Sequence, residues 1–222
     1  MNLIQGDALE IVKTFEANSV DHVFTSPPYN VGRKREGKST QRAKYEFFED
    51  NNGEYFVWCV EIINELLRIT KGHIFWNIQP NWTNKKDVYL LMGYYSDKLL
   101  QNFIWTKEFF TPASSQYAIS NAVEYILVIS NLNRVKGNKK FNKNHIHTTK
   151  RPAGSEDHNA VMNTEVADFI IENFTKEDQV ILDPFMGLGT TGISCKKFNR
   201  QFIGIELVQE YLNASYERIK NG

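Results

Sequence analysis

An α/β fold, with a mostly parallel sheet and helices on both faces, is predicted for this chain of 222 residues. Short apolar runs of strand type alternate along the sequence with longer segments whose apolar residues recur at helical spacing. One of the apolar runs ends in a glycine-bearing turn that leads into a helix, a connection typical of parallel sheets. The length suits a single domain spanning residues 1–222.

The elements are predicted from periodicity and from turn residues. Helices are expected at 9–15, 54–70, 84–99, 161–174, 190–199 and 207–220, where apolar residues share one face. Strands are expected at 20–25, 74–78, 103–105, 123–129, 179–183 and 201–205. A hairpin from 103 to 129 would place an antiparallel strand at one edge of the sheet. Residues 31–53 and 131–157 are polar and are expected to be irregular.

Charge is balanced overall but uneven along the chain. The formal net charge is zero, which neither requires nor excludes a nucleic-acid partner. Residues 131–151 carry seven basic side chains and no acid, and residues 32–44 carry six basic side chains and one acid. Either segment alone is typical of a solvated loop. Together, and beside the motifs below, they favour contact with phosphates.

Several classes of protein are disfavoured. No stretch is long and apolar enough to span a bilayer, and the first residues lack the basic and apolar regions of a secretory signal, so a cytoplasmic protein is expected. Cys59 and Cys195 have no metal-type spacing and are expected to be buried packing residues. The five histidines show no ligand spacing, so no catalytic metal is expected.

A candidate cofactor site lies near the C-terminal end of the sequence. A buried strand ends at Asp183, Gly187 and Gly189 follow, and a helix begins near Thr190. Glycines allow a ligand to approach the backbone closely, and a helix N-terminus offers unpaired N–H groups to a carboxylate. Glu206 ends the next strand, at a position where an acid commonly binds a ribose diol. The glycine spacing matches neither a dinucleotide fingerprint nor a phosphate loop, so a nucleoside cofactor is predicted.

A candidate catalytic turn, Thr25-Ser26-Pro27-Pro28-Tyr29, follows the first predicted strand. Two consecutive prolines fix the backbone and leave the nearby carbonyls available as acceptors. Such a turn can accept both hydrogens of an NH₂ group while the ring of Tyr29 stacks on a flat base, a contact worth roughly 1–3 kcal/mol. Accepting both hydrogens frees the delocalised lone pair of the amine for attack on a methyl group. Taken without the cofactor motif, this turn is more typical of a rigid surface corner.

Together these motifs resemble the amino-methylating DNA methyltransferases of restriction–modification systems and phages, in the permuted order called the beta class. In that class a catalytic tetrapeptide precedes the cofactor turn along the sequence. Here the tetrapeptide is Ser26-Pro27-Pro28-Tyr29, and it precedes the turn that follows Asp183 in the same way. The resemblance covers nearly the whole chain. It implies a Rossmann-like S-adenosylmethionine-dependent methyltransferase fold, S-adenosyl-L-methionine as cofactor, and double-stranded DNA as partner, with the target base flipped out of the helix.

The resemblance also assigns further residues. Asp7 matches an acid that contacts the cofactor adenine, and the segment 158–174 resembles the motif that lines the methionine end, with Asn159 in place of the usual proline. Glu124 occupies a position that is usually the second residue of a His-Glu pair, with Val123 in place of the histidine. The complete predicted cofactor site is Asp7, Thr25, Asp183, Pro184, Phe185, Gly187, Gly189, Thr190 and Glu206.

The first residue of the tetrapeptide bears on the choice of base. The family mostly has Asp there for adenine N6 and Ser for cytosine N4, so Ser26 favours cytosine N4, with adenine N6 as the alternative. Residues 131–157 are the candidate target-recognition insertion, and residues 31–53 are expected to close over the flipped base. The resemblance is compatible with a monomer and with a homodimer. It is also compatible with an enzyme that has a cognate restriction nuclease as partner and with one that has none.

Other functions are weighed against this one. Methyltransferases that act on protein glutamine also use a Pro-Pro-Tyr turn, but with Asn first and the cofactor motif upstream, and an enzyme acting on RNA is a further alternative. Cytosine C5 methylation requires a thiolate that follows a proline, and neither Cys59 nor Cys195 does so. A nucleic-acid-binding relative that has lost catalysis is the non-enzymatic alternative, which the intact tetrapeptide disfavours.

Overall fold

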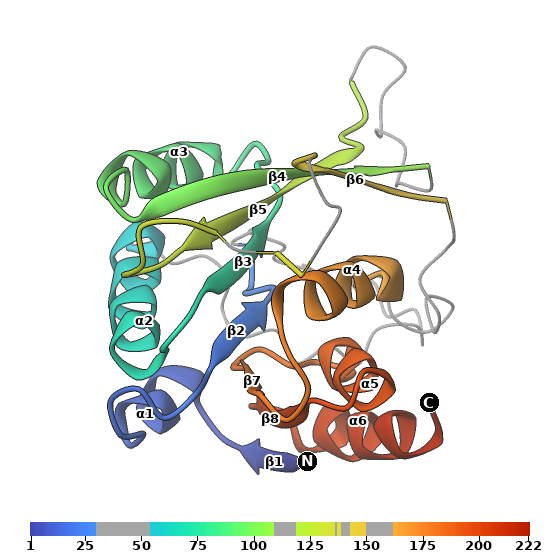
Figure 1. Cartoon of the computed structure of the whole chain (residues 1–222). Helices are drawn as coiled ribbons and strands as arrows, with labels where there is room; N and C mark the ends of the chain where they lie inside the picture. The colour runs from blue at the N-terminus through green and yellow to red at the C-terminus, as the bar shows by residue number, and fades with distance from the viewer. Residues whose placement is uncertain (30–53, 109–118, 136, 139–142, 150–161) are drawn as a thin grey trace, which may run out of the picture.

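The structure is a computed structural model, and it describes residues 1–29, 54–108, 119–135, 137–138, 143–149 and 162–222 (Figure 1). The elements in chain order are β1 (Asn2–Gln5), α1 (Ala8–Lys13), β2 (His22–Thr25), α2 (Tyr55–Ile69), β3 (Ile74–Ile78), α3 (Lys85–Tyr94), β4 (Leu99–Lys107), β5 (Val123–Ile129), β6 (His145–Thr148), α4 (Thr164–Phe174), β7 (Val180–Asp183), α5 (Thr190–Lys197), β8 (Gln201–Glu206) and α6 (Gln209–Asn221).

The strands form one eight-stranded sheet in the order β1-β8-β7-β2-β3-β5-β4-β6. Among the described strands only β5 is antiparallel to its neighbours, pairing with β3 on one side and β4 on the other. The fold class predicted from the sequence is confirmed. The expectation of an antiparallel strand at the edge is corrected, because β5 lies inside the sheet and the edge strand β6 runs parallel to β4.

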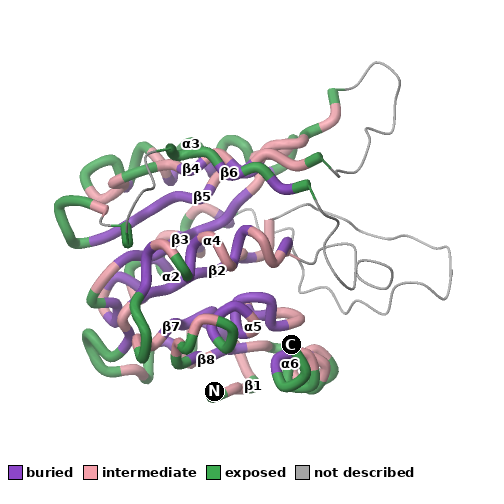
Figure 2. The backbone as a smooth tube through the Cα atoms, turned by 45° about the vertical axis from the view of Figure 1, so that its right-hand side comes forward, coloured by how far each residue is buried: buried purple, intermediate pink, exposed green. Residues whose placement is uncertain are grey.

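Two layers of helices cover the sheet. Helices α1, α2 and α3 contact one another on one face, and α4, α5 and α6 contact one another on the opposite face (Figures 1 and 2). The central strands β2 and β3 are buried along their whole length because both of their faces are covered. Figure 2 shows this buried interior running between the two layers of helices.

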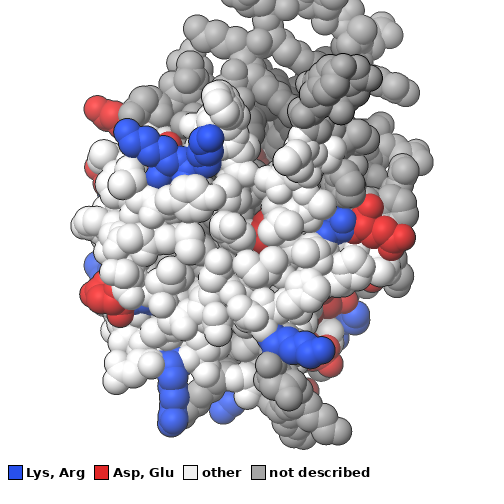
Figure 3. Space-filling model, turned by 90° about the horizontal axis from the view of Figure 1, so that it is seen from above, with Lys and Arg blue, Asp and Glu red and all other residues white. Residues whose placement is uncertain are grey.

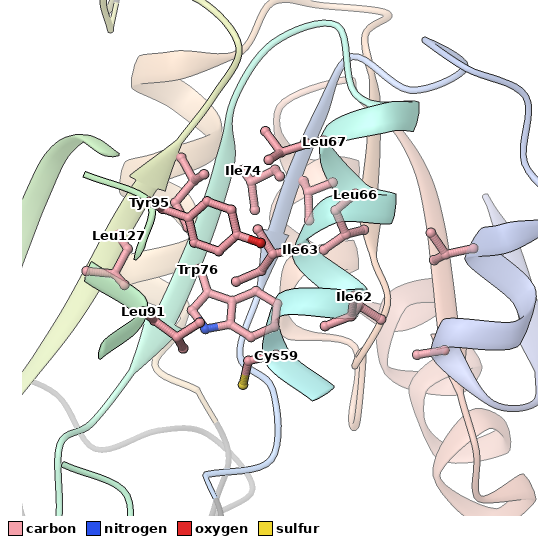
Figure 4. Packing of buried hydrophobic residues seen from close by; sticks show 14 of the residues in the cluster. Cys59, Ile62, Ile63, Leu66, Leu67, Ile74, Trp76, Leu91, Tyr95 and Leu127 are labelled. Carbon is pink, nitrogen blue, oxygen red and sulfur yellow. The ribbon is translucent and has the colours of Figure 1, made fainter. Parts of the chain in front are cut away.

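Side-chain alternation divides the core between the two faces. Ile74 and Trp76 of β3 pack against the apolar stripe of α2, whereas Phe75 points to the other face and packs against Phe174 of α4. Figure 4 shows Trp76 between α2 and the neighbouring strand β5, where Leu127 lies beside it. Cys59 is buried in this cluster, and Cys195 is buried on the other face, so both cysteines are packing residues as expected.

Four elements differ clearly from their predictions, and one of them is strand β4, which runs Leu99–Lys107 where a strand was expected at 103–105. Strand β1 was not expected, because its short run of residues 2–5 alternates only weakly, yet it pairs with β8 along its full length. Strand β6 lies within the segment 131–157 that was expected to be irregular, and its alternating burial comes from pairing with β4. Helix α3 ends at Tyr94 rather than at 99, since the chain from 99 on belongs to β4.

In the part of the chain that the structure describes, no helix is long and apolar enough to cross a membrane.

Candidate active site

The predicted site residues gather at one edge of the sheet. Seven of the described strands run in the same direction, so their C-terminal ends meet there, and β5 brings its first residues to the same edge. Asp7 follows β1, Thr25 ends β2, Asp183 ends β7 and Glu206 ends β8. This edge is the usual place for a ligand site in a parallel α/β sheet.

Asp183 joins the catalytic turn to the cofactor turn. Its Oδ1 accepts the hydroxyl of Thr25 at 2.7 Å and the backbone N–H of Phe185 at 3.1 Å, and its Oδ2 accepts the hydroxyl of Thr191 at 2.6 Å. Burial raises the pKa of this carboxyl to about 6, against the opposing effect of the hydrogen bonds. Both carboxylate oxygens of Asp183 therefore accept hydrogen bonds from the protein itself. Asp183 and Thr25 hold the catalytic turn and the cofactor turn together.

The two glycines of the cofactor turn have different reasons to be glycine. Gly187 has φ +52°, and a Cβ added there would meet nothing within 4 Å. Gly189 has φ +77°, and a Cβ there would lie 2.9 Å from Ile219 Cδ1 and 3.0 Å from Ser215 Cβ in α6. Gly187 therefore faces open space that a ligand can fill, whereas Gly189 permits close packing of two helices.

Glu206 holds the cofactor turn through two backbone hydrogen bonds. Its Oε2 accepts the N–H of Gly187 at 2.9 Å, and its Oε1 accepts the N–H of Val208 at 2.9 Å. Burial raises the pKa of the carboxyl, and these bonds oppose that rise. Each carboxylate oxygen has a second lone pair, so a partly buried Glu206 oriented in this way can still accept a hydroxyl.

The remaining predicted cofactor residues surround this turn. Asp7 caps α1 by accepting the N–H of Glu10 at 3.0 Å and is partly exposed. Pro184 is buried, and the ring of Phe185 lies 5.5 Å from that of Trp58 and 6.3 Å from that of Trp76. Thr190 is buried at the start of α5, with its hydroxyl 3.5 Å from the carbonyl oxygen of Met162.

The catalytic turn presents Ser26 and Tyr29 side by side. Ser26 Oγ lies 2.9 Å from Tyr29 Oη, and Tyr29 Oη donates to Glu124 Oε2 at 2.8 Å. Burial, followed by the negative charge of Glu124, raises the pKa of Tyr29 well above its ordinary value. Tyr29 is therefore a neutral phenol that donates its proton to Glu124.

The carbonyls of the turn are only partly available. Pro28 O accepts the hydroxyl of Tyr55 at 2.6 Å, and Tyr29 O accepts Asn84 Nδ2 at 2.7 Å. These two contacts correct the expectation that every carbonyl around the prolines is free. The carbonyl oxygen of Pro27 accepts no hydrogen bond from the described residues, and Ser26 Oγ accepts one long bond, from Asn77 Nδ2 at 3.3 Å. A hydroxyl oxygen has two lone pairs, so Ser26 Oγ and Pro27 O are both acceptors that this turn offers.

Two further residues at the site, Asn77 and Lys107, were not predicted. Asn77 Nδ2 lies 2.6 Å from Tyr29 Oη and 2.7 Å from Glu124 Oε2, and Lys107 Nζ forms an ion pair with Glu124 Oε1. A polar side chain within the apolar run Ile74–Ile78 was the available signal for Asn77. Lys107 gave none, because the predicted strand ended at residue 105, before this lysine.

Among the described residues no group of His, Cys, Asp and Glu side chains is arranged to hold a metal ion. The predicted closing loop, 31–53, lies outside the described residues, as do His158 and Asn159.

The comparison with protein families defines the class. A family model described as DNA methylase, covering the N6 and N4 methyltransferases, matches residues 20–217. The chain belongs to this family. It is an S-adenosylmethionine-dependent DNA methyltransferase that acts on exocyclic amino groups, as the motifs predicted.

Individual relatives span almost the whole chain. The protein YubD of Escherichia coli (strain K12) is 28% identical over an alignment of 225 positions that covers 97% of this chain and 88% of YubD. The type II methyltransferase M.ScaI of Streptomyces caespitosus is 26% identical, over 98% of this chain and 81% of its own length.

Solved structures share the fold. The cytosine-N4-specific PvuII DNA methyltransferase superimposes with a TM-score of 0.77 at 19% identity, over 99% of this chain and 89% of its own. The complex of M1.HpyAVI with S-adenosylmethionine gives a TM-score of 0.67 at 19% identity, over 98% of each chain.

Proposed function

We propose that this enzyme methylates the N4 amino group of cytosine in double-stranded DNA, with the base flipped into the turn Ser26–Tyr29. The observation that carries the proposal is Ser26 itself, which lies at the head of the turn beside Tyr29. The PvuII enzyme, which has the same fold, is described as specific for cytosine N4. Methylation of adenine N6 is the alternative.

The chemistry assigned to the turn is acceptance of the amine hydrogens. Ser26 Oγ and Pro27 O each accept one N–H of the base, which directs the nitrogen lone pair out of the ring plane. Tyr29 provides an aromatic face for the base. Bound S-adenosylmethionine supplies a methyl group activated by the positive charge on its sulfur. The amine lone pair forms the new N–C bond, the S–CH₃ bond breaks with its electrons going to sulfur, and the methylated amine releases one proton to water.

The cofactor is assigned to the turn between β7 and α5. The open space at Gly187 and the aromatic ring of Phe185 fit a ligand with a nucleoside and a flexible chain. We assign Glu206 to the ribose hydroxyls and Asp7 to the adenine, with Pro184 and Thr190 lining the turn. Thr25 and Asp183 hold this turn against the catalytic turn through their 2.7 Å hydrogen bond.

DNA contact is assigned to the basic segments. On the face shown in Figure 3, the described Lys and Arg side chains form small separate groups rather than one continuous band. The segments 32–44 and 131–151 contain the denser basic runs. We assign target recognition to residues 131–157, of which the structure describes 131–135, 137–138 and 143–149, including β6. Phosphate contacts there would make the affinity fall with salt.

The test is to incubate the purified enzyme with mixed-sequence duplex DNA and labelled S-adenosylmethionine, digest the DNA to nucleosides, and identify the product by mass. N4-methylcytosine supports the proposal. N6-methyladenine keeps the class and overturns the inference from Ser26. Ser26→Ala is the matched variant and should lose most of the activity while binding the cofactor normally; full activity in this variant would overturn the role of Ser26.

A further inference from the structure

A continuous chain of polar contacts runs beneath Ser26. Lys107 of β4 is paired with Glu124 Oε1, and Glu124 Oε2 accepts the hydroxyl of Tyr29 at 2.8 Å. Tyr29 Oη in turn lies 2.9 Å from Ser26 Oγ. Asn77 joins the chain from β3, with its Nδ2 2.6 Å from Tyr29 Oη.

The direction of these hydrogen bonds follows from counting donors. A lysine ammonium can only donate, and an ionised carboxylate can only accept. The single phenolic hydrogen of Tyr29 is therefore committed to Glu124. Its oxygen accepts Asn77 Nδ2 and retains one lone pair, so the contact between Ser26 and Tyr29 is a hydrogen bond only if Ser26 donates.

We propose that Glu124 and Lys107 act as positioning residues that orient the Ser26 hydroxyl so that its oxygen is a hydrogen-bond acceptor for the target amine. This inference rests on the proposed function of Ser26. A free hydroxyl can accept from an amino group or donate to a carbonyl. A hydroxyl held in this direction favours cytosine, which presents an amine, over thymine, which presents a carbonyl at the same position.

The surroundings make this orientation strong. The side chains of Glu124 and Lys107 are only 7% and 18% exposed, so water competes little for their hydrogen bonds. The ammonium of Lys107 lies 4.6 Å from the ring centre of Trp105, which covers one side of it. The bonds from Ser26 to Tyr29 and from Tyr29 to Glu124 run in one direction and polarise each other, which strengthens the serine oxygen as an acceptor, while Lys107 donates to Glu124 from the opposite side.

The position of Glu124 is set by the side chains packed against it. Of the elements packed against it, β4 presents Lys107, β3 presents Asn77, and the turn after β2 presents Tyr29. Among the described residues, Lys107 is therefore the charged group that contacts Glu124. Tyr29 is a neutral phenol at neutral pH. Removing the ammonium leaves the buried carboxyl of Glu124 without the partner that holds it in place beside Tyr29.

The experiment compares Lys107→Met with Lys107→Arg by measuring kcat and KM on mixed-sequence duplex DNA, together with the affinity for S-adenosylmethionine. We expect Lys107→Met to lower kcat while KM for DNA and the cofactor affinity stay native, because only the orientation of the Ser26 hydroxyl is lost. Lys107→Arg keeps the charge and should restore kcat. Native kcat in Lys107→Met, or an equal loss of kcat in both variants, would overturn the proposal.

A second variant tests the proposal if Lys107→Met does not fold. Glu124→Gln preserves the shape of the side chain, but an amide can donate as well as accept, so it no longer fixes the direction of the hydrogen bond with Tyr29. We expect kcat to fall about 10- to 100-fold, the size expected for the loss of a charged hydrogen-bond acceptor. Unchanged kcat in Glu124→Gln would also overturn the proposal. Failure of the proposed function would give a different result from failure of this inference. The native enzyme would leave the target amine of the DNA unmethylated, or Ser26→Ala would keep full activity.

Discussion

At the scale of single residues, Tyr29 stands out because the hydrogen-bonding capacity of its hydroxyl is fully used. Tyr29 Oη has three polar neighbours, Ser26 Oγ, Asn77 Nδ2 and Glu124 Oε2, within 2.9 Å. A phenol offers one donor and two lone pairs, so these partners saturate it. Tyr29 therefore contributes both an aromatic face and a hydroxyl, and the two contributions can be separated by substitution.

Tyr29→Phe keeps the ring and removes only the hydroxyl. We expect kcat to fall about 10- to 100-fold, because Ser26 loses its acceptor and Glu124 its donor. The affinity for S-adenosylmethionine should not change. Steady-state kinetics with DNA and calorimetric titration with the cofactor measure the two effects. Tyr95→Phe is the control: it makes the same chemical change at a hydroxyl bonded to Val60 O and Asn64, within the core, and should leave kcat unaltered.

Sequence reasoning identified single residues well where a motif fixed them. The turn Ser26–Tyr29, Asp183 and Glu206 all lie at the predicted strand ends. It did not foresee that Asp183 and Glu206 use their oxygens on backbone and hydroxyl groups, because such contacts depend on how neighbouring strands align. Lys107 was missed for the same reason: only pairing with β5 brings it to Glu124.

At the scale of elements, the turn between β7 and α5 separates two roles of glycine. Both Gly187 and Gly189 have positive φ, which costs roughly 1–2 kcal/mol for a residue with a side chain. Only Gly189 is also crowded, by Ile219 and Ser215 of α6. The same substitution at the two positions should therefore have different consequences.

Gly187→Ala should leave the fold largely intact and weaken binding of S-adenosylmethionine by at least about tenfold, which corresponds to about 1.4 kcal/mol. Gly189→Ala should instead lower the free energy of unfolding by more than Gly187→Ala does, since α6 must move away from the new methyl group. Denaturant unfolding and cofactor titration of both variants provide the measurement. Equal stability losses, or stronger cofactor loss in Gly189→Ala, would contradict this division of roles.

The elements themselves were predicted unevenly from the sequence. Buried strands such as β3 and helices with a clear apolar stripe such as α2 were found, because their patterns are local. Strands β1 and β6 at the two sheet edges were not, since their four-residue segments become strands only by pairing with β8 and β4. The place of β5 inside the sheet likewise depends on pairing partners that no local pattern specifies.

At the scale of the whole molecule, acid stability depends on buried groups away from the catalytic edge. His22 begins β2, next to His73, and its Nδ1 accepts the backbone N–H of His73 at 3.1 Å. Burial and the neighbouring His73 lower the pKa of His22 from 6.5 to about 4. The unfolded chain therefore binds a proton between these values that the folded chain does not, so His22 makes stability fall as the pH drops from 6.5 towards 4.

His22→Asn removes this titration while retaining an oxygen that can accept the same N–H. We expect the variant to lose less unfolding free energy than the native protein between pH 7 and about pH 5. Asp183 acts in the opposite sense: its pKa is raised from 3.8 to about 6, so it makes stability fall as the pH rises through that range. Chemical denaturation at several pH values measures the slopes. Identical slopes for the variant and the native protein would refute the assignment to His22.

The sheet order has a consequence for the way the chain acquires its structure. Among the described strands β1 pairs with β8 alone, and β2 has β7 as one of its two neighbours, so these two strands wait for partners that come much later in the sequence. The bond between Thr25 and Asp183 joins residues 158 positions apart. Contacts of such long range close large loops and slow folding. The catalytic edge therefore forms only after β7 and β8 have been synthesised, and until then β1 is an unpaired strand available to wrong partners.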